Sequence, residues 1–196
     1  MTHTLLRPLL LVASLFLAAC ETQTTLQAPS EALAGFKLGH AVVLAEKAVQ
    51  APISRNATPE EWTTAMNTAV AERFGRLNGD QVYHLGIHID GFAVAPPGIP
   101  LVVSPKSVLI FSVTLFANDS GGRKLNEKPK QITVFEGLSG ETVLGSGLTR
   151  TKAEQMQNLA FNGAKAIEDW ILENPHFLNP SLPVPVEEKP VQGGRG

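Results

Sequence analysis

Two helix-start signatures frame the middle of the sequence and constrain its fold more than any other feature. Thr58-Pro59-Glu60-Glu61 places a capping threonine three residues before a glutamate, with proline at the first helical position. Thr151 and Glu154 repeat the capping spacing. Apolar residues follow each start at three- and four-residue spacing, which predicts two amphipathic helices. The first stripe consists of Trp62, Ala65, Met66, Ala69, Val70 and Phe74, and the second of Met156, Leu159, Ala160, Gly163, Ala164, Ile167 and Ile171.

The residues between the two helices show the patterns of β-strands. Residues 83–94 alternate apolar and polar side chains and change parity at Gly91, which predicts a half-buried strand with a bulge. Residues 107–117 are apolar on both parities at first, as expected of a central strand. After a turn at 118–122, residues 131–136 are predicted to return as a neighbouring strand.

Two weaker segments complete the predicted order of elements. Residues 41–49 fit a helix or a strand, and the β-branched Val42 and Val43, with Pro52 close behind, favour a strand. A short strand at 142–144 is a further candidate. The order β-α-β-β-β-α predicts an α+β fold, in which a mainly antiparallel, twisted sheet carries two helices packed on one face.

The length of 196 residues leaves room for a single α+β domain, which we place at residues 36–175. Residues 21–35 are polar and lack periodicity, so residues 20–35 are predicted to form a flexible tether. Asn174-Pro175 ends the second helix. Residues 176–196 contain four prolines and a glycine-rich end, which predicts a disordered tail.

The first 19 residues have the composition of a signal peptide. Arg7 precedes an apolar run at residues 8–19, which at ~1.5 Å per residue is too short to cross a hydrocarbon core of ~30 Å as a helix. The run ends in Leu17-Ala18-Ala19-Cys20, which resembles the lipobox of bacterial lipoproteins. The resemblance implies that a signal peptidase recognises Leu17, Ala18 and Ala19, and that Cys20 carries diacylglycerol and an N-acyl chain. The alternative is an ordinary signal peptide with a chance cysteine.

The same resemblance implies a place in the cell envelope. Glu21 follows the cysteine, where an aspartate would resemble an inner-membrane retention signal, so the periplasmic face of the outer membrane is expected.

Cys20 is the only cysteine, so no disulfide can form within the chain. Once acylated, Cys20 would leave no thiol for thiolate catalysis, redox sensing or metal binding. We expect no cofactor beyond this covalent lipid.

The net charge of the chain limits the classes of partner that it is expected to bind. Sixteen basic and 18 acidic residues give a formal net charge of -2 at pH 7. This near-balance argues against a nucleic-acid-binding protein, which usually gathers a basic excess on one face. The expected partners are the membrane, reached through the lipid anchor, and an envelope protein.

Three groups of residues are candidates for a polar site. His84, His88 and Asp90 are metal-ligand types, but residues four apart on a strand lie about 13 Å apart, so a solvent-facing polar row is favoured over a metal site. Gly145-Ser146-Gly147 precedes the second helix but lacks the lysine of a phosphate-binding loop. Ser139 lacks the glycine pattern of a nucleophile elbow. We therefore predict no catalytic residue and no metal site.

The proline-rich stretch at 95–103 is the strongest candidate for a contact surface. It offers Ile99, Leu101, Val102 and Val103 to a protein partner or a ligand if they are exposed. Alternatively, the stretch folds back over the sheet and completes the core.

A second resemblance concerns the end of the domain. Residues 144–171, from Leu144-Gly-Ser-Gly to Asp-Trp-Ile171, resemble the C-terminal part of small lipoproteins of unknown function from α-proteobacteria. More distantly, the layout is similar to lipoprotein auxiliaries of envelope transport machines. These resemblances imply a place and an architecture. Because no set of nucleophile, base and orienting residue is visible, we expect a non-enzymatic lipoprotein that binds a partner in envelope transport or assembly. A module that binds a small ligand or a lipid is the alternative.

Overall fold

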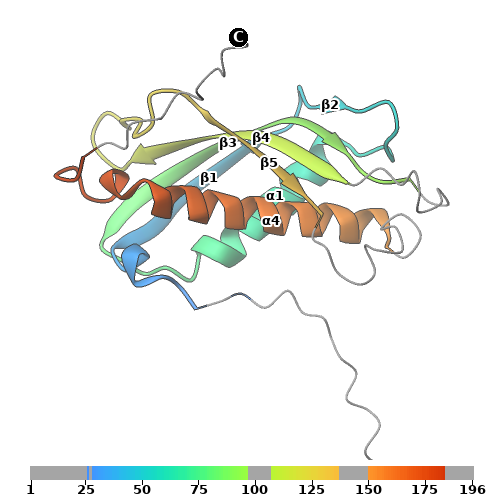
Figure 1. Ribbon diagram of the computed structural model, residues 1–196. Helices are drawn as coiled ribbons and strands as arrows, with labels where there is room; N and C mark the ends of the chain where they lie inside the picture. The colour runs from blue at the N-terminus through green and yellow to red at the C-terminus, as the bar shows by residue number, and fades with distance from the viewer. Residues whose placement is uncertain (1–25, 27, 97–106, 137–149, 184–196) are drawn as a thin grey trace, which may run out of the picture.

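The computed structural model describes residues 26, 28–96, 107–136 and 150–183 (Figure 1). Its strands are β1 (Phe36–Leu44), β2 (Val49–Gln50), β3 (Gln81–Ala93), β4 (Val108–Ala117) and β5 (Lys130–Phe135). Its α-helices are α1 (Pro59–Phe74) and α4 (Lys152–Glu173), and its short 3-10 helices are η1 (Glu31–Leu33) and η3 (Pro175–Phe177). The predicted order of elements is confirmed, with β2 as an addition. None of the described helices is both long and apolar enough to span a membrane.

The described strands form one sheet in the order β1-β3-β4-β5, and β2 continues the β1 edge beside β3. β1 and β2 run parallel to β3, because α1 returns the chain to the same end before β3 begins. β3, β4 and β5 are antiparallel neighbours. The predicted α+β fold with a mainly antiparallel sheet is therefore confirmed.

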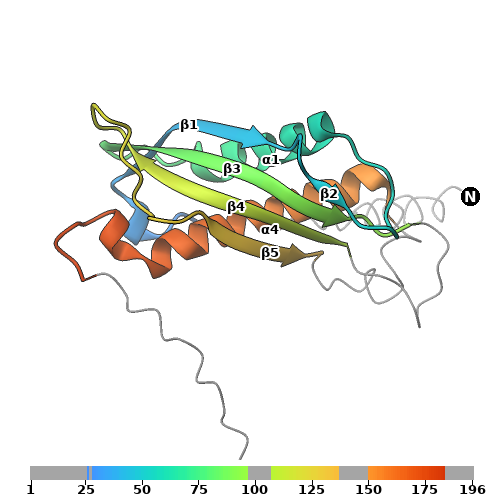
Figure 2. The same ribbon diagram turned by 90° about the horizontal axis from the view of Figure 1, so that it is seen from above.

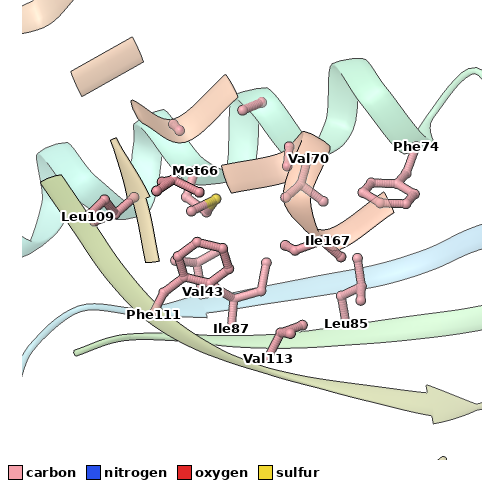
Figure 3. Packing of buried hydrophobic residues seen from close by; sticks show 14 of the residues in the cluster. Val43, Met66, Val70, Phe74, Leu85, Ile87, Leu109, Phe111, Val113 and Ile167 are labelled. Atoms are coloured by element: carbon pink, nitrogen blue, oxygen red, sulfur yellow. The ribbon is translucent and has the colours of Figure 1, made fainter. Parts of the chain in front are cut away.

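Both α-helices pack against one face of the sheet, and none of the described helices lies on the opposite face (Figures 1 and 2). Each helix begins with the predicted capping box: the hydroxyls of Thr58 and Thr151 accept from the amides of Glu61 and Glu154. The core lies between the helices and the sheet (Figure 3). It includes Val43, Met66, Val70, Phe74, Leu85, Ile87, Leu109, Phe111, Val113 and Ile167.

Gly163 marks the place where α4 comes closest to its neighbours. A Cβ atom on Gly163 would lie 3.0 Å from Met66 Cε and 3.2 Å from Phe111 Cε1. The absence of a side chain therefore allows α4 to contact α1 and β4 together.

A buried ion pair that the sequence pattern did not reveal joins the two helices. Arg73 Nη1 donates to Glu168 Oε2, and only 5% and 10% of the two side chains are exposed. Arg76 Nη2 lies 3.6 Å from Glu168 Oε1. The Arg73 guanidinium also lies 4.9 Å from the centre of the Phe161 ring.

The boundaries of the domain lie further out than the sequence suggested. Leu33, placed in the tether, is fully buried in the core through η1. Phe177, placed in the tail, is buried against Trp170 at a ring separation of 5.1 Å. The first strand covers residues 36–44, whereas 41–49 was expected, because the chain turns at Glu46 and Lys47.

Candidate binding surface

The sheet face opposite the helices, called here the open face, is built from side chains that alternate with core residues. Along β3, Tyr83, Leu85, Ile87 and Ile89 are buried, whereas the residues between them are partly exposed. The register places them in rows across the strands, and one row consists of Leu44, His88, Ser112 and Gln131. The bulge predicted at Gly91 is confirmed, since the register of β3 and β4 shifts between Ile89 and Gly91.

Apolar side chains are exposed along two margins of the open face. Val42 and Leu44 on β1 are 56% and 47% exposed, and Val49 on β2 is 69% exposed. On the other margin, Phe135 of β5 is 57% exposed and lies opposite Val108 of β4. Exposed apolar side chains gathered on one face are typical of contact surfaces.

A polar cluster lies between these margins, around Asp90. Ser112 Oγ donates to Asp90 Oδ2 at 2.6 Å, and His88 Nδ1 lies 2.8 Å from Oδ1. Burial by itself raises the pKa of Asp90, but hydrogen bonds from Ser112, His88 and Gln131 outweigh it and hold the pKa below its ordinary value. Asp90 is therefore an ionised carboxylate at neutral pH.

The order of these hydrogen bonds differs from that of a nucleophilic triad. A catalytic histidine stands between the serine and the carboxylate, so that it can take the serine proton. Here the carboxylate stands between Ser112 and His88, and the serine proton is directed to Asp90. The cluster is organised to present a carboxylate.

The histidines of the predicted polar row have separate partners. The backbone N–H of His40 donates to His84 Nδ1 at 3.0 Å, so the neutral ring carries its proton on Nε2, which donates to Asn118 Oδ1 at 3.1 Å. The rings of His40 and His84 stack at 5.1 Å. His84 thus holds the irregular part of β1 against β3, whereas His88 forms a hydrogen bond with Asp90. In the described part of the chain, no group of three His, Cys, Asp or Glu residues has metal-site geometry.

A second polar cluster, absent from the sequence prediction, joins the ends of β3, β4 and β5. Ser107 Oγ accepts from the amide of Ala95 at 3.1 Å, and Ser107 O accepts from the amide of Glu136 at 3.1 Å. Arg150 Nη1 donates to Glu136 Oε1 at 2.8 Å, and the Glu136 side chain is only 1% exposed. The only sequence signal for this cluster was a polar residue at the end of each of two apolar strands.

Most of the predicted site residues lie outside the described part of the chain. They include the lipidation residue and its recognition sequence, the apolar contact candidates, and the glycine-rich segments. These are Leu17, Ala18, Ala19, Cys20, Ile99, Leu101, Val102, Val103, Ser139, residues 142–144 and Gly145–Gly147.

No protein-family model matches the chain, and the search of curated proteins finds no significant match. Among solved structures, a Xanthomonas campestris protein of the family DUF330 has 16% identity and a TM-score of 0.44, over 70% of this chain and 84% of that one. A candidate lipoprotein from Caulobacter crescentus has 14% identity and a TM-score of 0.35, over 78% and 96%. A minor lipoprotein from Acinetobacter baumannii has 16% identity and a TM-score of 0.30, over 68% and 92%. At these identities and TM-scores, the likenesses carry no argument about function.

Proposed function

We propose that the chain is a non-enzymatic bacterial lipoprotein, anchored through Cys20, whose domain binds a protein partner in envelope transport or assembly. The anchor rests on Leu17-Ala18-Ala19-Cys20 and the apolar run before it. We place the anchor in the periplasmic face of the outer membrane, because Glu21 follows the cysteine. Two or three acyl chains would hold the domain stably, since a single chain binds a membrane only marginally.

The observation that carries partner binding is the open face. It leaves Val42, Leu44, Val49 and Phe135 in water, each at 47–69% exposure, whereas Val43 of β1 and Val134 of β5, which face the helices, are buried. Burial of each Å² of apolar surface contributes roughly 25 cal/mol, so a complex in which a partner covers this face would be stabilised by that burial. We include the apolar segment with Ile99, Leu101, Val102 and Val103 as a second contact element.

The length of the tether limits where the partner can be. Cys20 and Ser30, the N-cap of η1, are ten residues apart in the sequence. Fully extended, this stretch spans at most about 35 Å. The domain therefore stays close to the membrane surface, and its partner must be membrane-bound or come within that distance.

Site-specific photocrosslinking in intact cells tests this proposal. A benzophenone side chain would replace Val42, Leu44 or Phe135 on the open face, and Gln157 or Lys165 on the exposed side of α4 as matched controls. We expect one discrete protein adduct from the open-face positions and none from α4. Adducts with phospholipid alone would support the ligand-binding alternative, and equal labelling from both faces would contradict the proposed surface.

A further inference from the structure

Asp90 is unusual in its position. It is the only acidic residue in the five described strands, whose other charged residues are Lys37 and Lys130. It lies on β3, an inner strand of the sheet, with its hydrogen-bond partners on β3, β4 and β5. The exposed Leu44 lies opposite His88, two residues from Asp90, and the exposed Phe135 lies at the far margin of the open face, opposite Val108.

The negative charge of Asp90 has no cationic partner in the described part of the chain apart from a protonated His88. Its hydrogen bonds come from the hydroxyl of Ser112, the ring of His88 and the amide of Gln131. None of the described ion pairs joins Asp90 to a lysine or an arginine. Its side chain is 27% exposed, so water reaches the carboxylate from the open face.

A partner that covers the open face must compensate the Asp90 carboxylate for the water that it loses. Apolar surface that covers an ionised carboxylate removes its hydrating water without a hydrogen bond or an ion pair to replace it, which is strongly unfavourable. The acyl region of a lipid layer supplies no cation either, and a face-to-face contact of two copies would bring two Asp90 carboxylates together. A guanidinium or ammonium group replaces the lost water with a charge-assisted hydrogen bond.

We infer that the partner segment that binds the open face is apolar and carries one arginine or lysine, whose cationic group contacts the Asp90 carboxylate. The inference rests on the proposed partner binding and adds the chemistry that selects the partner. Leu44 and Phe135 supply apolar contact at the two margins of the open face, and Asp90 fixes the register of the bound segment. Arginine fits the site best, because its planar guanidinium presents several N–H donors in a geometry that matches a carboxylate and is more weakly hydrated than an ammonium group.

The test combines the open-face crosslink at Leu44 with charge changes at Asp90. Asp90→Lys is expected to lower the crosslink yield at least tenfold, and Asp90→Asn about threefold to tenfold. Glu72→Lys, the same charge change on the exposed side of α1, should leave the yield unchanged. The crosslinked peptide, identified by mass spectrometry, should contain an arginine or lysine, and its replacement by glutamate should restore the yield with Asp90→Lys.

The outcomes separate the inference from the proposed function. A crosslinked protein segment without a cationic residue, or an unchanged yield with Asp90→Asn, overturns the inference and leaves partner binding intact. Complete absence of protein adducts from the open face overturns both. If Asp90→Lys does not fold, as judged by its thermal melt, Asp90→Asn and the sequence of the crosslinked peptide decide the question.

Discussion

At the scale of single residues, the ionised state of Asp90 affects stability as well as recognition. Its pKa is lower in the folded chain than in an unfolded one, where about 3.9 is usual. Its stabilising effect is therefore complete above that value and is lost as the pH falls through the lower, folded pKa. Asp90→Asn should lower the free energy of unfolding by about 1–2 kcal/mol at pH 7. Urea titrations of both proteins between pH 7 and pH 2.5 should show this difference shrinking below about pH 4, and a constant difference would contradict it.

The Arg73–Glu168 pair is a second residue-scale test. Glu168→Leu leaves a buried guanidinium without its carboxylate and should cost about 3 kcal/mol of unfolding free energy in urea. The double variant Arg73→Met with Glu168→Leu removes both charges and should recover most of that loss. A double variant no more stable than Glu168→Leu would show that the ion pair is not the cause.

At the scale of elements, the two α-helices were predictable because their signals are local. A capping threonine with a glutamate three residues later fixes a helix start within one turn, and both starts were correct. The strand at 36–44 was placed too late, because Phe36 and Leu38 gain their burial from α1 and β3, which lie far along the sequence. The Asp90 cluster could not be predicted from local signals either, because Ser112 comes close to Asp90 only through the register of β3 and β4.

The β1 irregularity offers an element-scale prediction with a matched control. A Cβ atom on Gly39 would lie 2.6 Å from His84 Cε1 and 2.7 Å from Val82 Cγ1, so Gly39→Ala must displace the ring that accepts from the His40 amide. We expect a cost of about 1–3 kcal/mol and faster hydrogen exchange along β1. Gly35→Ala has no atom within 4 Å of its new Cβ and should change stability by less than about 1 kcal/mol. Equal effects of the two substitutions would refute the steric explanation.

At the scale of the whole molecule, the fold class was predictable and the contact surface was not. Hydrophobic period and turn residues gave the β-α-β-β-β-α order, but which sheet face lacks a cover depends on the packing of both helices. Val42 and Leu44 illustrate this, because the sequence gives no sign that Val43 between them is buried while they are exposed.

The lipid anchor should be independent of the fold. All residues of the described core follow Cys20 in the sequence, so Cys20→Ser should leave the thermal melt of the domain unchanged. The same variant should accumulate as an uncleaved, unacylated precursor in cell fractions. Normal processing of Cys20→Ser would refute the lipobox interpretation.

The central claim is that Cys20 becomes the acylated first residue of the mature chain. Its most direct test is the intact mass of the protein extracted from membranes with detergent, followed by the mass of its N-terminal peptide. We expect a chain that begins at Cys20 and carries a diacylglyceryl group, with or without a further N-acyl chain. A chain that keeps residues 1–19, or a Cys20 that reacts with maleimide as a free thiol, would contradict the account.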